Sequence, residues 1–470
     1  MKKITRLVFL FSLFSLFSSA NLFAQHQTDK WYFGVLAGVD FTPAVPAALN
    51  NGALNTSEGC ASISDSAGNL LFYSDGQTIW NSLHAPMPNG TGLSGGITCT
   101  QVAVIVPKPG SPNLYYEFTL DDTGGVNGLQ YSVVDMTLDG GNGDVTSEKN
   151  VFVRNNLTEK MTAVAHANGI DYWIAVHENG SDAFNVYPLT AAGLDTNAIV
   201  SNAGIVHSTA QIQNTYGQMK FSPCGNMIAL AAGYLNTIEI FNFNNSTGVV
   251  SAYVTIPMTD HVYGIEFSPD GNMLYASTYD PGQTLVQFDL TSGVPATIIA
   301  SQTPLSVTSD IYGLQLARDE KVYVCKSFSS WLGVVNNPNT AGSGCNYSDT
   351  GIDLDPLFNG VTSALSLPGF VQSWLKGEGA CGPTGIQPMQ PQITLNVFPN
   401  PANDELFISG LTDKGILNIY NSLGEIVQTE YLDSDHGKLN ISGLNAGVLF
   451  YSIQNLQKQE IKYGSFAIVR

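Results

Sequence analysis

A short pattern occurs three times in the middle of the chain, at nearly constant spacing. Its copies begin at Tyr216, Tyr263 and Tyr312, and each reads Tyr-Gly, a strand-like stretch, a tight turn and a second strand-like stretch. The steps between copies are 47 residues (263 − 216) and 49 residues (312 − 263). Because a four-stranded blade of a β-propeller takes about 40–50 residues, the repeat predicts propeller blades, each copy forming an inner hairpin.

Weaker copies of the hairpin lie upstream, at residues 60–73, 102–115 and 162–172. A seventh inner strand is expected at residues 362–368, where no full blade follows. Outer strands for it are available near the N-terminus, at residues 30–33, 39–41 and 53–55. Pairing the two ends of the chain closes the ring and removes exposed sheet edges. The predicted body is therefore an all-β, seven-bladed propeller over residues 30–376, with six or eight blades as alternatives.

The C-terminal part has a strand rhythm of its own. Turn-forming stretches such as Pro399-Asn-Pro401 and Asn445-Ala-Gly447 separate its apolar runs. The runs lie at residues 395–398, 405–409, 416–420, 426–431, 438–441, 448–453 and 461–469. They predict a small β-sandwich over residues 393–470, joined to the body by a Gly- and Pro-containing linker at residues 377–392.

Three motifs in this C-terminal part resemble those of a known export signal. They are Pro-Asn-Pro-Ala at 399–402, Ile-Tyr-Asn-Ser-Leu-Gly-Glu at 419–425 and Leu-Asn-Ala-Gly-Val-Leu-Phe-Tyr at 444–451. The pattern resembles the type A C-terminal sorting domain of the type IX secretion system of Gram-negative bacteria. The resemblance implies that the type IX machinery is a partner and that the protein is secreted or attached to the outer-membrane surface. The alternative is an ordinary adhesive β-module. One departure is the end of the chain, where many members are lysine-rich and this sequence has an apolar strand and Arg470.

The N-terminus has the features of a signal peptide. Residues 1–6 include three basic residues, residues 7–17 are mostly apolar, and small residues precede a cleavage point near Ala24. The apolar run is too short for a transmembrane helix, which needs about 20 residues. We therefore expect residues 1–24 to be removed and the mature chain to contain no transmembrane segment.

The body also resembles a set of exported propeller proteins that often carry such sorting domains. The stretches that carry the resemblance are residues 31–34, 58–65, 68–76, 105–110, 332–339 and 367–373. The resemblance implies a fold and a location, but it brings no established activity.

The charge of the chain limits its partners. It contains 18 basic and 38 acidic residues, a net charge of −20. Loss of Lys2, Lys3 and Arg6 with the signal peptide leaves 15 basic residues, so the mature charge is 15 − 38 = −23. Such a surface repels phosphate backbones. Nucleic acid is therefore excluded as a partner, and an extracellular protein, glycan, matrix component or small ligand is expected.

Six cysteines occur in the mature region: Cys60, Cys99, Cys224, Cys325, Cys345 and Cys381. Export makes disulfides possible. Cys325 and Cys345 flank one outer hairpin and are predicted to pair, whereas the other pairings stay open. No Cys-x-x-Cys or Cys/His cluster suggests a metal, and no cofactor is predicted.

The Tyr-Gly repeats supply the candidate binding site. Asn214, His261 and Asp310 occupy the equivalent position two residues before each tyrosine. Together with Tyr216, Tyr263 and Tyr312 they are predicted to form a rim at the channel entrance that contacts a small polar ligand or a peptide. The alternative is structural: the tyrosines pack between blades and the polar residues cap strand ends.

Three further motifs carry possible chemistry. Gly92-Leu-Ser-Gly-Gly96 matches the nucleophile-elbow pattern, but a preceding strand and following helix are missing, so a loop is expected. Residues 139–144 offer oxygen ligands but not the order of a calcium loop, and a hairpin turn is expected. His166 and His177 lie on one hairpin, where they can approach each other, without the spacing of a metal site. No catalytic residue is assigned.

Two functional classes remain. The first is a secreted or cell-surface binding module. The second is a propeller hydrolase of a lactonase-like type, with its site at the mouth of the central channel. The body contains only two arginines, Arg154 and Arg318, and neither accompanies an obvious acid and base. The sequence favours binding, and a buried carboxylate cluster on the axis would favour the hydrolase.

Overall fold

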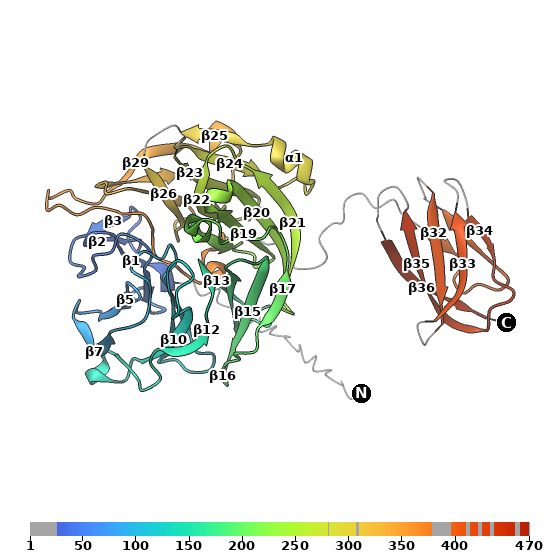
Figure 1. Ribbon diagram of the computed structural model, residues 1–470, viewed down its shortest axis with the longest axis horizontal. Helices are drawn as coiled ribbons and strands as arrows, with labels where there is room; N and C mark the ends of the chain where they lie inside the picture. The colour runs from blue at the N-terminus through green and yellow to red at the C-terminus, as the bar shows by residue number, and fades with distance from the viewer. Residues whose placement is uncertain are drawn as a thin grey trace, which may run out of the picture. The chain divides into compact units, whose positions relative to one another are not determined.

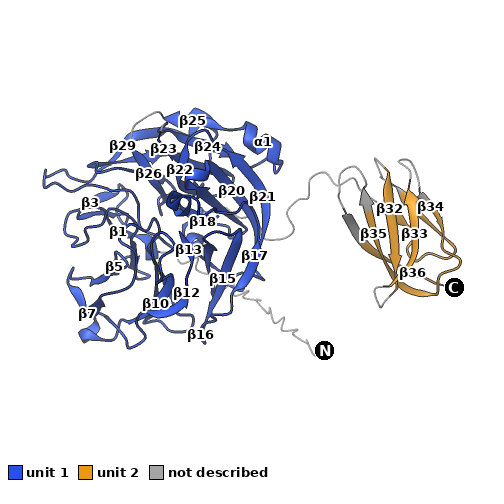
Figure 2. Ribbon diagram, in the orientation of Figure 1, with its two compact units in different colours: residues 1–382 blue, residues 383–470 orange. Residues whose placement is uncertain are grey.

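The chain forms two compact units, residues 1–382 and residues 383–470 (Figure 2). The computed structural model describes residues 26–280, 282–306, 310–377, 396–409, 414–421, 425–432, 437–455 and 461–469. The predicted signal peptide and all but the first residue of the predicted linker lie outside these ranges. The described part of the chain contains no helix that is both long and apolar enough to cross a bilayer.

Most of the first unit consists of antiparallel sheets that follow one another along the chain. The first sheet contains β4 (Ala61–Ser64), β5 (Leu70–Ser74), β6 (Thr78–Asn81) and β7 (Pro86–Thr91). The second contains β8 (Ala103–Pro107), β9 (Leu114–Leu120), β10 (Leu129–Asp135), β11 (Asp144–Val145) and β12 (Val151–Arg154). The third sheet contains β13 (Leu157–Ala165), β14 (Tyr172–Glu178), β15 (Ala183–Thr190), β16 (Gly193–Leu194) and β17 (Ile199–Asn202). The fourth contains β18 (Met219–Phe221), β19 (Met227–Ala232), β20 (Thr237–Asn244) and β21 (Val249–Pro257).

Two further sheets complete this series. The fifth contains β22 (His261–Phe267), β23 (Met273–Tyr279), β24 (Leu285–Asp289) and β25 (Thr303–Ser306). The sixth contains β26 (Ile311–Leu316), β27 (Val322–Lys326), β28 (Trp331–Val335) and β29 (Tyr347–Asp353). A short helix, α1 (Pro295–Ala300), lies between β24 and β25. All six inner hairpins predicted from the repeat are confirmed as the first two strands of these sheets.

Positive backbone φ angles explain the turns of the repeated hairpins. Gly225 and Gly271 have φ values of 65° and 73°, a region that costs little for glycine. In the third copy Glu320 adopts a φ of 60° at the corresponding turn. The turn geometry is therefore kept where the sequence has lost its glycine, which is why the third copy is harder to recognise.

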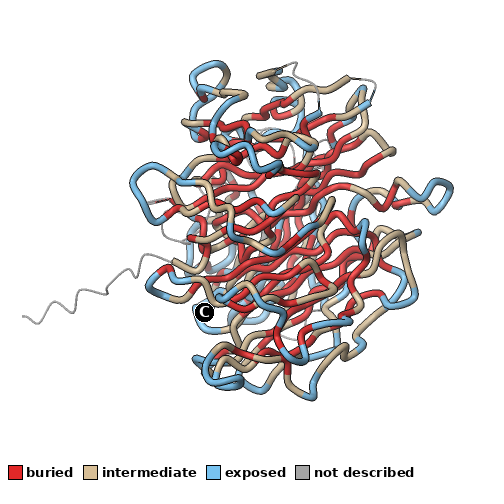
Figure 3. Tube along the Cα trace, turned by 90° about the vertical axis from the view of Figure 1, so that its left-hand side faces the viewer, coloured by how far each residue is buried: buried red, intermediate tan, exposed pale blue. Residues whose placement is uncertain are grey.

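The sheets are arranged around one axis as the blades of a β-propeller. The first strand of each sheet packs on the first strand of the next, in the order β4, β8, β13, β18, β22 and β26. Figure 1 shows β13 and β22 toward the centre, with β7, β16 and β25 at the periphery. The first strands are almost entirely buried, whereas an outer strand such as β21 alternates between buried and exposed residues. Figure 3 shows buried residues along the strands and exposed residues in the peripheral loops.

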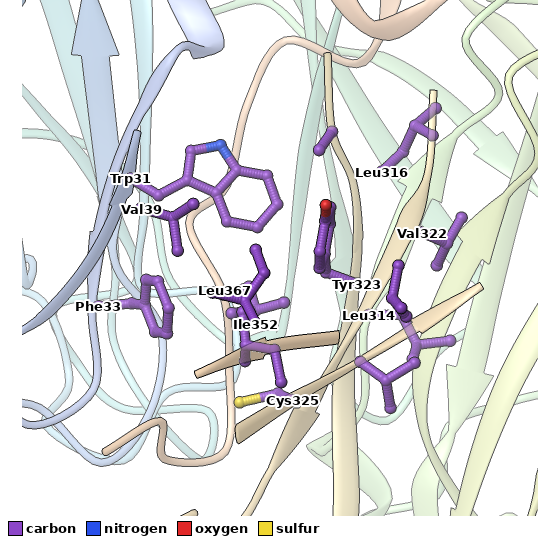
Figure 4. Close-up of a cluster of buried hydrophobic side chains, with 14 of the residues drawn as sticks. Trp31, Phe33, Val39, Leu314, Leu316, Val322, Tyr323, Cys325, Ile352 and Leu367 are labelled. Atoms are coloured by element: carbon purple, nitrogen blue, oxygen red, sulfur yellow. The ribbon is translucent and has the colours of Figure 1, made fainter. Parts of the chain in front are cut away.

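An N-terminal sheet closes the ring. It contains β1 (Lys30–Phe33), β2 (Ala37–Asp40) and β3 (Ala47–Leu49). On one side, the Trp31 ring lies 5.9 Å from that of Tyr323 on β27 (Figure 4). On the other side, the Ser62 hydroxyl of β4 donates to the Lys30 carbonyl over 2.8 Å. With this sheet the strand order supports seven blades, a number that stays a prediction.

Residues 361–375, which we call the axial segment, run along the centre of the propeller. Thr362 forms an antiparallel bridge with Val35, and further on Gly369 and Val371 form parallel bridges with Ala61 of β4 and Ala163 of β13. The segment ends in a 3-10 turn at Gln372–Leu375. The inner strand predicted at residues 362–368 is therefore wrong beyond its first residue, because the backbone leaves the N-terminal sheet and bonds to several other blades.

The second unit is a β-sandwich. One sheet contains β30 (Asn396–Phe398), β31 (Glu405–Ser409) and β34 (Gly437–Asn440), and the other contains β33 (Ile426–Leu432), β32 (Gly415–Tyr420), β35 (Gly447–Asn455) and β36 (Ile461–Ile468). Leu406 of the first sheet and Leu417, Ile419 and Phe466 of the second are buried in one core. All seven predicted strands are confirmed, with small shifts at their ends.

Candidate functional site

The Tyr-Gly repeats bring three tyrosines to one end of the propeller axis. Tyr263 lies in β22, Tyr312 in β26, and Tyr216 three residues before β18. The glycines let neighbouring backbones approach: a Cβ atom on Gly264 would lie 2.3 Å from the Tyr312 carbonyl oxygen, and one on Gly313 would lie 2.9 Å from the Leu365 carbonyl oxygen. We call this end, where the first strands begin, the mouth.

Aromatic rings from neighbouring blades pack together at the mouth. The ring centroids of Tyr263 and Tyr312 are 5.3 Å apart at 85°, and Tyr279 lies 6.0 Å and 5.9 Å from them. Tyr234 stacks on His261 at 3.7 Å and lies 6.2 Å from Tyr279. Tyr263 is buried, whereas the other rings of the cluster are half-exposed. The hydroxyl oxygen of Tyr279 is buried and has no hydrogen-bond partner among the described residues.

Glu58 places a carboxyl group among these tyrosines. It precedes β4, and its Oε2 accepts a hydrogen bond from the Tyr263 hydroxyl. Burial raises the pKa of Glu58 to about 8, against the effect of the hydrogen bond from Tyr263. Burial also raises the pKa of Tyr216 and of Tyr312, and the charge of Glu58 contributes to both shifts. Glu58 therefore lies within electrostatic reach of tyrosines from three blades.

A second buried carboxylate, Glu159 of β13, accepts hydrogen bonds from the segments that surround the tyrosines. Its Oε2 accepts from the Thr100 amide at 2.9 Å and hydroxyl at 2.8 Å. Its Oε1 accepts from the Thr123 amide at 3.1 Å and the Thr215 hydroxyl at 3.5 Å. The next residue, Lys160, donates to the Thr215 and Tyr216 carbonyls at 2.8 Å and 2.7 Å, and burial lowers its pKa to about 7. Glu159 and Lys160 therefore hold the loops around the tyrosines.

The polar residues predicted for the rim have different surroundings. Asn214 is 4% exposed and donates to the Ser208 carbonyl at 2.7 Å. His261 stacks on Tyr234, and its Nδ1 lies 2.6 Å from the Asn236 side-chain oxygen. Asp310 is exposed in a left-handed turn with a φ of 69°. The described contacts do not join these three residues in one ring, because the segments before the three strands have different backbones.

Three residues of the mouth were missed from sequence: Glu58, Tyr234 and Tyr279. The repeat gives no direct signal for Glu58, because Glu58-Gly59 lies just before the first hairpin copy at residues 60–73 and ahead of the position that the Tyr-Gly pairs hold. A Cβ atom on Gly59 would lie 2.6 Å from the Val102 amide nitrogen, the same kind of close approach as at Gly264 and Gly313. Tyr279 is recognisable only through strand register, which pairs it with His261.

Apolar side chains project from two loops on the same face. Turns between second and third strands of a blade lie at the mouth end, because the strands alternate in direction. Phe328 follows β27 and is 58% exposed, while Leu357 and Phe358, after β29, are 70% and 94% exposed. The Asp355 carboxylate fixes the second loop by accepting from the Asn359 and Gly360 amides at 2.6 Å and 2.8 Å. This loop is held in shape while its apolar side chains face solvent.

The predicted disulfide between Cys325 and Cys345 is wrong, because both are free, buried thiols. The Cys325 thiol points to the axial segment and donates to the Ala364 carbonyl at 3.2 Å. Cys345 lies beside Tyr275 instead. Cys60 and Cys99 are also free, whereas Cys224 is disulfide-bonded. Cys381 lies outside the described residues.

The other sequence motifs have structural roles or different partners. Residues 92–96 lie in a loop, and residues 139–144 connect the antiparallel strands β10 and β11, both as predicted. His177 does not approach His166: its ring stacks 4.1 Å from His207, and His166 faces Trp173 at 4.9 Å. Over the described ranges, no group of three or more His, Cys, Asp or Glu side chains is arranged to hold a metal ion.

Comparison with solved structures returned propeller-like chains of low identity. A candidate 6-phosphogluconolactonase from Bacteroides fragilis is 11% identical with a TM-score of 0.45, over 72% of this chain and 97% of that one. The periplasmic gluconolactonase of Pseudomonas aeruginosa is 13% identical with a TM-score of 0.35, over 76% and 96%.

PorZ, a surface component of the type IX secretion system of Porphyromonas gingivalis, is 12% identical with a TM-score of 0.33. The match covers 92% of this chain and 63% of PorZ, less than two thirds of that protein. With TM-scores this low, the propeller assignment rests on the strand order, and no activity follows from these proteins.

No curated protein matches this chain, but its C-terminal unit matches a family model. Residues 396–463 match the family model described as the secretion system C-terminal sorting domain. This range spans nearly all the strands of the β-sandwich. The chain is therefore an exported β-propeller protein that carries a type IX C-terminal sorting domain, for secretion or for attachment to the outer-membrane surface.

Proposed function

We propose that the protein is a binding module that uses the mouth of its propeller to hold a protein, glycan or matrix ligand outside the cell. The observation that carries this proposal is the cluster at one end of the axis in which Tyr263 donates a hydrogen bond to Glu58 and packs 5.3 Å from the half-exposed Tyr312. The side chains come from three blades, so the folded ring positions them before a ligand arrives. Aromatic rings with a few polar groups are typical of recognition surfaces.

The axial segment supports a ligand that binds at the surface of the mouth. The Gly313 amide donates to the Leu365 carbonyl at 2.9 Å, and the Ser366 hydroxyl donates to the Thr100 carbonyl at 3.1 Å. Backbone and side chains therefore occupy the axis directly beneath the tyrosines. The exposed Phe358 loop on the same face adds apolar surface that a larger partner can cover.

The alternative of a lactonase-like hydrolase would use Glu58 as its acid. A pKa of about 8 keeps this carboxyl largely protonated at neutral pH, which suits proton donation. Hydrolysis also requires a group that activates water. Glu159, the nearby carboxylate of the same network, already accepts four hydrogen bonds. Glu58 and Glu159 are buried carboxylates of the kind this alternative requires, but the hydrogen bonds to Glu159 leave it poorly suited to activate water, so we favour binding. Turnover of a lactone panel by the wild type that Glu58→Gln abolishes would favour the hydrolase.

The proposal is tested by mapping binding to one end of the propeller. The mature chain, its Tyr216→Ala/Tyr312→Ala variant and a Leu83→Ala/Ile170→Ala control are applied to glycan and peptide arrays. Leu83 and Ile170 are 68% and 66% exposed, on turns at the end opposite the mouth. We expect array ligands of the wild type and control that the mouth variant loses, with all three proteins equally folded by circular dichroism. Ligands lost only with the control variant would overturn the proposal.

A further inference from the structure

We propose that the mouth binds a positively charged group, an ammonium or a guanidinium, against tyrosine rings and the Glu58 carboxylate. This inference rests on the proposed function and specifies the ligand class of the same site. A lysine or arginine side chain of a peptide, or a small organic cation, would present such a group.

Tyrosine rings of the mouth lie close to the Glu58 carboxyl and can attract a cation bound there. A cation is attracted to the face of a tyrosine ring within about 6 Å of its centre. The half-exposed Tyr216 and Tyr312 both lie in the electrostatic neighbourhood of Glu58. The buried Tyr263 packs edge-to-face against Tyr312 and holds the Glu58 carboxyl by its hydroxyl. A cation on Glu58 would therefore meet rings from more than one blade.

Further carboxylates reinforce the negative potential of the mouth. Asp122 contributes to the raised pKa of Tyr216, and Asp280 and Asp310 contribute to that of Tyr312, in each case after burial as the largest cause. The basic residue beneath them, Lys160, is fully buried and donates to two backbone carbonyls, so its charge is directed inward. With a chain charge of −20, long-range attraction also favours cations.

One polar atom of the cluster still lacks a partner. The Tyr279 hydroxyl is buried and makes no hydrogen bond within the described structure, although it lies in the same ring cluster as Tyr263 and Tyr312. A buried hydroxyl without a partner costs free energy. It can accept a hydrogen bond from the N–H groups of an ammonium or guanidinium. A neutral sugar would also stack on tyrosine but would not use the carboxylates as charges.

The protonation state of Glu58 gives the site a measurable signature. With a pKa of about 8, this carboxyl carries a proton in most molecules at pH 7. A bound cation stabilises the ionised carboxylate and therefore lowers its pKa. Binding at pH 7 should release up to one proton for each ligand, and it should strengthen as the pH rises toward 8.

The experiment is calorimetric titration of the mature full chain with Nα-acetyl-arginine amide. Nα-acetyl-citrulline amide, which has the same shape and no charge, is the matched ligand. We expect arginine to bind about tenfold or more tightly than citrulline, which is about 1.4 kcal/mol. Titrations in buffers of different ionisation enthalpy should show proton release that Glu58→Gln abolishes.

Three variants separate the roles of ring and charge. Tyr312→Phe keeps the ring and should retain most of the affinity, whereas Tyr312→Leu should lose about tenfold. Asp139→Asn removes a carboxylate from an exposed turn at the opposite end, where Asn also tolerates the φ of 48°, and should bind as the wild type does.

Equal affinities for arginine and citrulline amides, or no binding of either, would overturn this inference. If the arrays still yield mouth-dependent neutral ligands, the proposed function survives that result. If the arrays yield no mouth-dependent ligand either, both proposals fail. Arginine binding without proton release, unchanged in Glu58→Gln, would place the cation elsewhere and also overturn the inference.

Discussion

Tyr263 at the start of β22 donates a hydrogen bond to the carboxyl group of Glu58, which precedes β4. The two residues are 205 positions apart in sequence. Their sheets are not neighbours in the ring, since other first strands separate β4 from β22 in both directions. The bond therefore joins two distant blades across the mouth, and it ties the candidate ligand site to the closure of the propeller.

The first prediction concerns the pH dependence that Glu58 gives to stability. Its folded pKa, about 8, lies above the ordinary value of 4.5, so the folded state binds the proton more tightly. The resulting stabilisation is present below pH 4.5 and is lost as the pH rises toward 8, by at most about 1.4 kcal/mol per pH unit. Glu58→Gln should remove this loss, so the free-energy difference between variant and wild type should grow from pH 5.5 to pH 7.5.

Urea denaturation at the two pH values measures this difference. Asp139→Asn, at an exposed turn, serves as the control and should follow the wild type at both. A difference between Glu58→Gln and the wild type that does not change with pH would contradict the burial of the Glu58 carboxyl.

The second prediction concerns an ion pair on the axis. Lys220 of β18 lies 3.3 Å from Glu266 of β22, and it also donates to the Gln315 side chain of β26. All three side chains are buried. Lys220→Met would leave the Glu266 charge buried without its cation, at a cost of about 3–5 kcal/mol. The double variant Lys220→Met/Glu266→Gln should recover much of this loss. Equal destabilisation of the single and double variants, measured by urea denaturation, would show that the charges are not coupled.

The third prediction concerns the axial segment. Leu367 is 3% exposed and lies in one core with Trp31 and Tyr323 (Figure 4). Leu367→Ala should lower the free energy of unfolding by about 2–5 kcal/mol. Leu357→Ala, ten residues earlier and 70% exposed, should change it by less than about 0.5 kcal/mol. If the two variants were equally stable, the axial segment would not be part of the propeller core.

The sequence predicts the parts of the fold that local contacts determine, and it fails where contacts between distant residues determine the backbone. Hairpins such as that of Tyr263 are local, since alternating apolar residues and a turn glycine specify them within about a dozen positions, and all six were predicted. The sandwich strands were predicted for the same reason. The path of the axial segment depends on contacts with Ala61 and Ala163, hundreds of positions away. No local pattern encodes such contacts, so a regular strand was wrongly expected there.

In the candidate site, too, the residues that belong to the repeat were predicted and those placed by tertiary contacts were not. The repeat brought Tyr216, Tyr263 and Tyr312 to attention because each starts an equivalent strand. Glu58 lies two residues ahead of the hairpin copy at residues 60–73, where the repeat is weak, so periodicity does not point to it. The orientation of Asn214 depends on a 3-10 turn after an irregular loop, which periodicity does not describe. The free thiol of Cys325 likewise follows from its tertiary partner, Ala364.

The fourth prediction concerns a buried pair of histidines. His177 and His207 are fully buried, their rings are 4.1 Å apart, and the His207 Nε2 lies 3.6 Å from Glu239 Oε2. Burial lowers the pKa of His177 to about 3, and the pKa of His207 is also lowered. The unfolded chain therefore takes up these protons first, and stability should fall as the pH drops below 6.5.

His177→Leu removes one of these titratable groups and keeps an apolar side chain of similar size in its place. Its free energy of unfolding should therefore depend less steeply on pH between 6.5 and 4.5 than that of the wild type. His166→Leu, which changes a histidine near the surface beside Trp173, is the control and should keep the slope of the wild type. An unchanged slope in His177→Leu would show that this ring is not held neutral.

The central claim is that the ligand contacts the mouth, and site-specific photo-crosslinking in the producing cells tests it most directly. The photoreactive residue p-benzoylphenylalanine replaces Tyr312 at the mouth or Ile170 at the opposite end, which is 66% exposed. After irradiation, mass spectrometry identifies what each exported protein carries. The account predicts a crosslinked ligand at position 312 and none at position 170, whereas the same ligand crosslinked at position 170 and absent from position 312 would contradict it.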